Sequence, residues 1–148
     1  MNPLQQMQAL GQSPWQDNIS REQLKSGELA LMVSAGDITG LTSNPTIFQQ
    51  AISGSHDYDG SIRAHSKYGS RVEEVFYALA SEDIQAAADI FIPVYERSAG
   101  QDGFVSLEIS PRLAHDTDAS VRETLQIWQR VERPNLMIKI PATRPGLA

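Results

Sequence analysis

The segment RPNLMIKIPATRPGLA, residues 133–148, decides the fold, because it contains a clear strand pattern with a charged residue inside it. Side chains alternate across a strand, so Leu136, Ile138 and Ile140 share one face and Lys139 lies on the other. An ammonium group in such an apolar run is costly unless it is paired or used. The segment therefore predicts a strand with an apolar face for covering helices and a functional group near its C-terminal end.

The segment GFVSLEIS, residues 103–110, repeats this pattern. Val105, Leu107 and Ile109 point one way, whereas Ser106 and Glu108 point the other way.

The segment DITGLTSNP, residues 37–45, behaves similarly, since Thr42 and Asn44 share a parity at its C-terminal end. Three strands that end in polar groups on the same side predict a cup of hydroxyl, amide, carboxyl and amine groups.

Earlier segments predict further elements. Within SPWQDNIS (13–20) we expect a brief strand that carries Asp17 at its end, and helices are expected over residues 4–10 and 46–54. The stretch 20–36 begins with Ser20 and Gln23, a capping-box pattern, and predicts a helix that is imperfect around Gly27.

Later segments predict mainly helices. Between residues 58 and 98 we expect helices broken near Gly69 and Ser81, with Pro93 bending the last one or starting a new turn. A helix is expected over 116–132, with Asp118 or Thr117 as its N-terminal cap. Its inward residues are expected to be Val121, Leu125, Ile127 and Trp128.

Strands that alternate with helices indicate an α/β fold with parallel strands and crossover helices. The loops contain no glycine-rich dinucleotide fingerprint and no phosphate loop. Polar groups near the C-terminal ends of several strands favour a (β/α) barrel over a doubly wound sheet, because barrel enzymes place their chemistry there.

The composition limits the class of function. The 148 residues carry a formal net charge of −6, which argues against nucleic acid or an anionic membrane as the main partner. The chain has no cysteine, which excludes disulfides and thiolate nucleophiles. No signal peptide and no membrane-spanning stretch is visible, so we expect a soluble, cytoplasmic protein.

Lys139 has two interpretations. In a partly dry pocket the ammonium form is disfavoured, so the neutral amine can attack a ketone and form a Schiff base. Alternatively, Lys139 extends to solvent or pairs with a carboxylate such as Glu108.

The neighbouring candidates also have a structural and a functional interpretation each. Glu108 is either an acid–base group acting through a water or the counter-ion of Lys139. Asp17 is either a proton carrier or the cap of the following helix. The Asn44-Pro45 pair is typical of a turn, and Thr46 could help start the next helix.

A metal site and a serine triad are not expected. His56, His65 and His115 lie far apart in sequence, and the group HDTD at 115–118 also fits a helix start. No serine lies in a nucleophile elbow.

Two long motifs, GLTSNPTIF (40–48) and LMIKIPATRPGL (136–147), resemble the signature segments of the transaldolase family. The segments WQDNISREQLKSGEL and DGFVSLEIS also resemble that family, in the same order. The resemblance covers nearly the whole chain and is weaker in the first dozen residues and over 56–100.

The resemblance implies a (β/α)8 barrel enzyme of the pentose phosphate pathway that needs no cofactor or metal. Such enzymes move a dihydroxyacetone unit from a ketose phosphate, such as sedoheptulose 7-phosphate or fructose 6-phosphate, to an aldose phosphate. By motif position, Lys139 would form the Schiff base, Asp17 would be the acid–base group, and Glu108 would act through a water. Thr42 and Asn44 would line the side that binds substrate hydroxyls.

The sequence differs from the family in length, because the family's barrel has eight strands and this sequence supplies about four. We therefore expect residues 1–148 to be the N-terminal part of one barrel domain, with no internal boundary. Two other functions stay open: an aldolase that releases dihydroxyacetone from fructose 6-phosphate, and an inactive half-barrel that serves as an interaction module. Exposed strand edges and apolar faces predict self-association.

Overall fold

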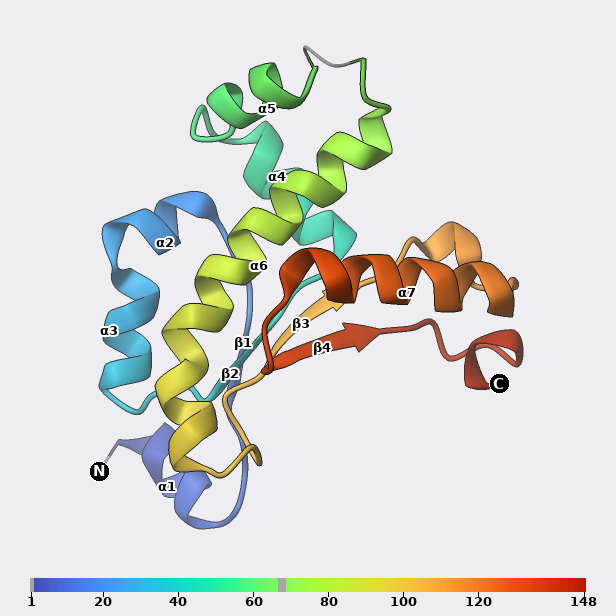
Figure 1. Ribbon diagram of the computed structural model, residues 1–148. Helices are drawn as coiled ribbons and strands as arrows, with labels where there is room; N and C mark the ends of the chain where they lie inside the picture. Colours follow the sequence, from blue (N-terminus) through green and yellow to red (C-terminus); the bar gives the residue numbers. More distant parts are fainter. Residues whose placement is uncertain (1, 67–68) are drawn as a thin grey trace.

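The computed structural model describes residues 2–66 and 69–148 and contains one parallel sheet (Figure 1). The strand order is β1-β2-β3-β4, so each strand lies beside its neighbour in sequence. The bounds are β1 (Trp15–Asp17), β2 (Gly40–Thr42), β3 (Val105–Glu108) and β4 (Leu136–Lys139). This confirms the predicted α/β class, and sequential parallel strands are the arrangement of part of a (β/α) barrel.

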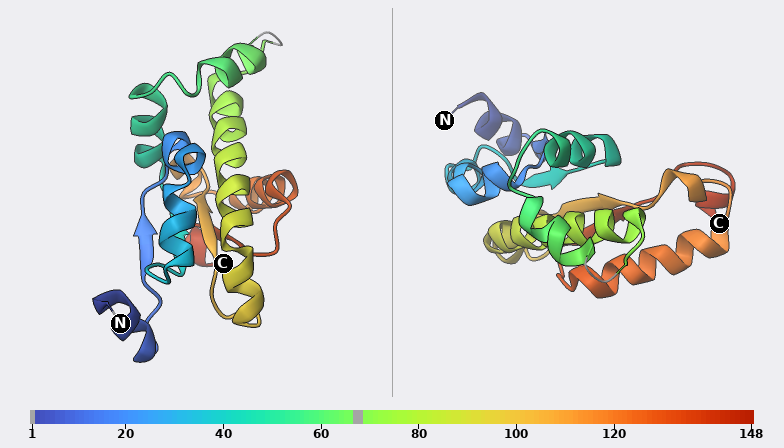
Figure 2. Two further views of the ribbon diagram at one scale, coloured as in Figure 1. Left: turned by 90° about the vertical axis from the view of Figure 1, so that its left-hand side faces the viewer. Right: turned by 90° about the horizontal axis from the view of Figure 1, so that it is seen from above.

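Seven helices occupy the described residues, and the connections between strands contain six of them. Figure 1 shows that α6 and α7 cross in front of the sheet, and Figure 2 shows both on the same side of β3. The bounds are α1 (Pro3–Ala9), α2 (Arg21–Ser26), α3 (Glu28–Ser34), α4 (Pro45–Ser53), α5 (Asp59–Ser66), α6 (Val72–Arg97) and α7 (Thr117–Val131), with the 3-10 turns η1 (Pro111–Leu113) and η2 (Pro145–Leu147).

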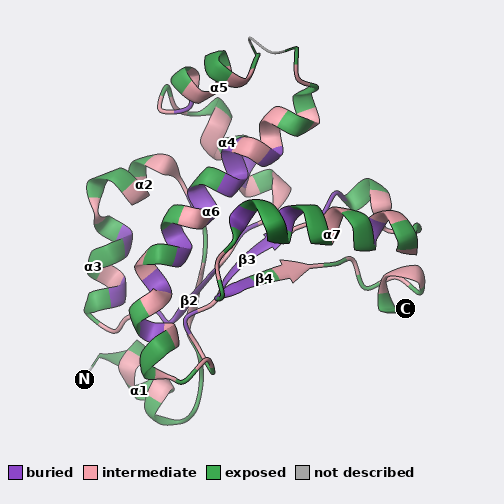
Figure 3. Ribbon diagram, in the orientation of Figure 1, coloured by how far each residue is buried: buried purple, intermediate pink, exposed green. Residues whose placement is uncertain are grey.

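The core lies between the sheet and the helices that cover it (Figure 3). The predicted apolar face of β3 is buried, with Val105 and Ile109 fully inaccessible and Leu107 nearly so. Ile84 and Phe91 of α6 are also fully buried in this core. Alternation along β3 therefore directs one set of side chains into the core and leaves the other set for a site.

Glycines set two local features of the N-terminal half. Gly27 has a left-handed backbone (φ 80°) and separates α2 from α3, as the imperfect helix pattern predicted. Gly40 pairs with Trp15, and a Cβ at Gly40 would lie 2.4 Å from an indole carbon of Trp15. Close approach of the indole to β2 therefore requires glycine at position 40.

The capping box at the start of α2 is only half formed. The Ser20 hydroxyl accepts a hydrogen bond from the Gln23 amide at 3.2 Å, as expected. The Gln23 side chain instead bonds with Gln16 at 2.7 Å, so it does not return to the backbone of Ser20.

The predicted helix break at Ser81 is wrong, because α6 is continuous from Val72 to Arg97. Ser81 is buried in the helix, and Pro93 lies within it without ending it. The expected break near Gly69 is confirmed, since α5 ends at Ser66 and α6 begins at Val72.

The predicted inward face of α7 is largely wrong. Ile127 is buried, but Val121, Leu125 and Trp128 are 46–55% exposed. The cap is Asp116, not Thr117 or Asp118, because the Asp116 carboxylate accepts a hydrogen bond from the Ala119 amide at 2.9 Å.

The buried residues of α7 are Ser120, Ile127 and Val131, which lie on one side of the helix at helical spacing, so the observed and predicted faces share Ile127.

Candidate active site

The Lys139 side chain lies at the C-terminal end of β4 and contacts groups from two other strands. Its amine donates to the Ser43 carbonyl at 2.7 Å and to the Thr42 hydroxyl at 3.3 Å. The amine also forms an ion pair with Glu108 at 3.3 Å. Three acceptors thus surround Nζ, which matches the three hydrogens of an ammonium group.

The parallel register brings Glu108 and Lys139 together, because the two residues are direct partners in the β3–β4 pairing. Pairing with a carboxylate was one of the two interpretations of Lys139, and the geometry is compatible with that interpretation and with acid–base use of Glu108. Both side chains remain partly open to solvent, since 38% of the Lys139 side chain and 24% of the Glu108 side chain are exposed.

A hydroxyl chain supports the amine, and sequence reasoning did not assign it. The Ser106 hydroxyl donates to the Thr42 hydroxyl at 2.9 Å, and Thr42 accepts from Lys139. The Ser43 hydroxyl donates to the Ser106 carbonyl at 2.7 Å, which holds the ends of β2 and β3 together. Ser106 shares the parity of Glu108, so alternation could have found it; the Ser43 carbonyl has no side-chain signal.

Asp17, Asn44 and Glu108 line a common hollow of about 490 Å³ beside these strand ends. Asp17 is exposed at the end of β1 and pairs in register with Thr42. The structure therefore brings Asp17 to the same C-terminal end of the sheet as Lys139, although no direct contact joins the two side chains.

Two local alternatives can now be decided. Asp17 does not cap the following helix, because Ser20 occupies that position. Asn44, not Thr46, caps α4, since its side-chain oxygen accepts from the Ile47 amide at 2.9 Å. The amide nitrogen of Asn44 has no partner within residues 2–66 and 69–148, which leaves a donor at the hollow.

Neither metal ligation nor a membrane span is indicated in the part of the chain that the structure describes. There, no group of three or more histidine, aspartate or glutamate side chains could hold a metal ion. In the same residues, every helix is too short or too polar to cross a bilayer.

Two kinds of comparison with known proteins identify the family. The family described as "Transaldolase/Fructose-6-phosphate aldolase" matches residues 14–148. A protein of Thermobifida fusca named "Transaldolase" is 49% identical over 146 residues, which cover 99% of this chain and 40% of that protein. Proteins of the same name from Thiobacillus denitrificans and Mycobacterium marinum are 44% and 42% identical, again over 99% of this chain.

The lengths differ, because this chain spans about two fifths of each of these relatives (39–41%). The match nevertheless runs from the first strand to the last residue, and it includes the strand-end cup. The resemblance predicted from the two signature segments is confirmed, and the four-stranded sheet corresponds to part of the barrel. The chain belongs to the transaldolase/fructose-6-phosphate aldolase family.

Proposed function

We propose that this chain carries the Schiff-base part of a transaldolase. The observation that supports this most directly is the position of the Lys139 amine. It lies at a strand end, in contact with the Ser43 carbonyl, Thr42 and Glu108. The substrates would be ketose and aldose phosphates of the pentose phosphate pathway, and the protein would act in the cytoplasm.

Schiff-base formation would begin when the Lys139 ammonium loses one proton. Glu108 is the carboxylate within ion-pair distance and would accept that proton directly or through a water. The neutral amine then attacks C2 of the ketose, and the carbinolamine loses the oxygen as water. The product is an iminium ion, which is a strong electron sink.

Carbon–carbon cleavage would follow beside the iminium. Asp17 takes the proton of the C4 hydroxyl while the C3–C4 bond breaks, and the bonding electrons move into the iminium to give an enamine. The aldose phosphate leaves, and the enamine attacks the carbonyl of an acceptor aldose. Hydrolysis of the new iminium returns Lys139 and the product ketose. The hydroxyl of Thr42 and the free amide nitrogen of Asn44 would position the substrate hydroxyls.

Borohydride trapping tests the nucleophile. The chain is incubated with fructose 6-phosphate and borohydride, and the adduct is located by peptide mass mapping. Lys139 is one of three lysines in the sequence, so the assignment is unambiguous. We expect a dihydroxyacetone-sized adduct at Lys139, loss of the adduct in Lys139→Ala, and retention in the control Lys25→Ala.

Two other outcomes would select the alternatives. Release of free dihydroxyacetone, unchanged by an added aldose phosphate, would indicate an aldolase. An adduct absent from this chain but present in a longer relative would favour an inactive half-barrel that acts as an interaction module. Adduct formation that survives Lys139→Ala would show that the nucleophile is wrong.

We also propose that the chain associates with a second copy. β1 and β4 are the edges of the sheet, and α7 exposes Leu125 and Trp128. Size-exclusion chromatography with light scattering at micromolar concentration should give a dimer. Leu125→Glu should shift it toward monomer, whereas the control Gln129→Glu should not. A monomer in the wild-type chain would contradict the proposal.

A further inference from the structure

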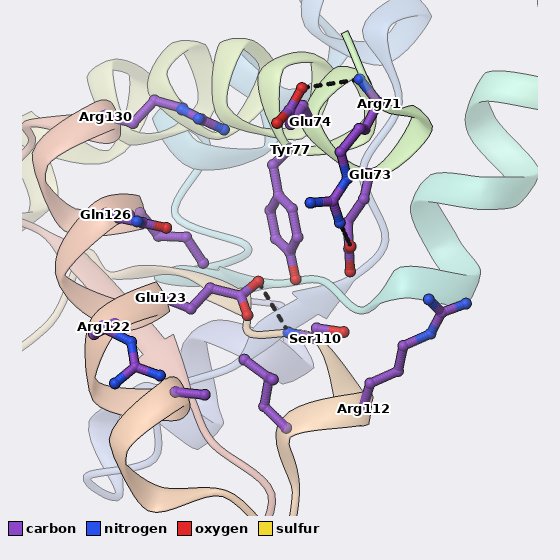
Figure 4. A pocket seen from close by; sticks show the side chains of 13 residues that line it. Arg71, Glu73, Glu74, Tyr77, Ser110, Arg112, Arg122, Glu123, Gln126 and Arg130 are labelled. Atoms are coloured by element: carbon purple, nitrogen blue, oxygen red, sulfur yellow. Dashed lines mark hydrogen bonds and ion pairs between the residues drawn. The ribbon is translucent and has the colours of Figure 1, made fainter.

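A polar cleft lies on the helical side of the sheet, between α6, η1 and α7 (Figure 4). Its volume is about 470 Å³, and its lining comes from residues 71–77 and from the later stretch 110–130. The Lys139 amine, by contrast, lies among the ends of β2, β3 and β4. The two locations are therefore separate.

Four arginines make the cleft positively charged. Arg71, Arg112, Arg122 and Arg130 line it, and of these only Arg71 has a carboxylate partner, Glu73 at 3.4 Å. The other three guanidinium groups have no side-chain partner among residues 2–66 and 69–148. Four arginines against three glutamates leave one net positive charge in the cleft, whereas the whole chain carries a formal charge of −6.

The floor of the cleft is fixed by Tyr77 and Glu123. The Tyr77 side chain is buried, and the Glu123 carboxylate lies close enough to influence its hydroxyl. Glu123 also accepts a hydrogen bond from the Ser110 amide at 3.3 Å. Burial, and then the Glu123 carboxylate, raises the pKa of Tyr77, so the phenol stays protonated. Because the Ser110 amide already donates to Glu123, this carboxylate is less able to neutralise the neighbouring arginines.

The view of the cleft shows how the charges are distributed. In Figure 4 the guanidinium groups of Arg112 and Arg122 lie on opposite sides of the Glu123 carboxylate. A guanidinium fork suits phosphate oxygens and can bind two of them at once. The cavity is larger than a phosphate group requires, and Glu73 and Gln126 add acceptors for hydroxyl groups.

We propose that this cleft binds a phosphorylated polyol, with the phosphate held by the unpaired arginines and the hydroxyls by the carboxylate and amide groups. A simple polyanion suits the cleft less well, because three glutamates would oppose it. The proposal concerns binding only and does not depend on Schiff-base chemistry at Lys139.

The cleft is nevertheless a neighbour of the strand-end site. An adjoining hollow shares Arg71, Tyr77 and Arg112 with the cleft, and it shares Pro45 and Pro111 with the hollow that Glu108 lines. A test must therefore distinguish ligand in the cleft from ligand among the strand ends.

D-Glucitol 6-phosphate is a suitable probe, because it has phosphate and hydroxyl groups but no carbonyl with which Lys139 could react. Binding is measured by titration of amide chemical shifts in two-dimensional NMR. We expect the shifts to centre on Ser110, Ala119 and Glu123, with smaller effects at Thr42. Free D-glucitol and inorganic phosphate should each bind more weakly than the probe.

Arg112 and Arg122 are exposed, so their replacement should not disturb folding. Arg112→Gln and Arg122→Gln should each weaken binding about tenfold, as expected for loss of a charge-assisted hydrogen bond. Arg97→Gln, which removes the same charge at the far end of α6, should change binding less than about twofold. The proposal is overturned if the probe does not bind, if both cleft variants bind like the wild type, or if the shifts centre on Thr42 and Glu108.

Discussion

The ion pair between Arg21 and Asp83 joins the start of α2 to the middle of α6 and should be a main determinant of stability. Arg21 Nε lies 2.8 Å from the Asp83 carboxylate, and 3% of the Asp83 side chain is exposed. The Tyr58 hydroxyl donates to the other Asp83 oxygen at 2.7 Å, and its ring lies under the Arg21 guanidinium at 4.4 Å. Burial raises the pKa of Asp83, whereas the hydrogen bonds from Tyr58 and Arg21 oppose this rise.

Arg21→Met should cost about 3–4 kcal/mol of unfolding free energy at pH 7, because it leaves a buried carboxylate without its cation. The cost of Arg21→Met cannot exceed the free energy of protonating Asp83, because a neutral carboxyl group no longer needs the cation. A carboxyl group with an ordinary pKa of about 3.9 needs about 4 kcal/mol to be neutral at pH 7, and about 1.5 kcal/mol at pH 5. Loss of the Arg21 cation raises the pKa of Asp83 in the folded state further, so the folded variant binds more protons than the unfolded chain as the pH falls. The penalty should therefore shrink as the pH falls toward 5.

Urea denaturation at fixed protein concentration, at pH 7 and pH 5, measures this effect. Arg133→Met is the matched control, since Arg133 pairs with Asp89 at 2.6 Å but both side chains are partly exposed, and it should cost less than about 1 kcal/mol. Adding Asp83→Asn to Arg21→Met should cost less than the sum of the single changes. A loss below about 1 kcal/mol with no pH dependence would refute the reasoning, because it would show that Asp83 does not depend on Arg21.

Three further predictions follow from the backbone and from the buried tyrosines. Burial raises the pKa of Tyr58 and of Tyr77, so ultraviolet difference titration should show both ionising only as the chain unfolds. Stability should be unaffected below about pH 10 and should fall as the pH rises above it; early ionisation of all four tyrosines would contradict this. Gly40→Ala should lower stability by about 1–3 kcal/mol in urea denaturation, because its methyl group meets Trp15, and an unchanged midpoint would argue against the contact. Glu132→Gly should raise stability by about 0.5–1 kcal/mol, since Glu132 ends α7 with φ 49°, and a lower melting temperature would be the opposite result.

Strand positions could be predicted from the sequence because their alternation agrees with the tertiary structure. Val105, Leu107 and Ile109 are buried as expected, and Lys139 and Glu108 lie together on the other face. The parallel order follows from the helices between the strands.

The false break at Ser81 shows how a local signal can be overridden. Ser81, Glu82 and Asp83 together are typical of a helix start. In the structure Asp83 instead pairs with Arg21, and Glu82 accepts from Arg21 at 2.7 Å and from Ser61 at 3.1 Å. These polar residues serve tertiary contacts on the side of a continuous helix, and a single sequence does not distinguish the two uses.

The error on α7 has a different cause. The sequence places apolar residues on two adjoining sides of the helix, and periodicity alone does not say which side faces the sheet. Burial favours the side with Ser120, Ile127 and Val131, whereas Val121 and Trp128 are left exposed. An exposed apolar stripe of this kind is typical of a surface that another segment or chain covers.

Register connects the core to the candidate site. On β3 the residues 105 and 107 pack under α6, and the residues between and after them, Ser106 and Glu108, belong to the polar cup. A slip of one residue would exchange the two sets, placing Glu108 in the apolar layer and removing it from Lys139. Substitutions at Val105 should therefore reduce stability first, whereas those at Ser106 should first change how the Lys139 amine is held. The same alternation that gives the sheet its core thus fixes which side chains can take part in chemistry.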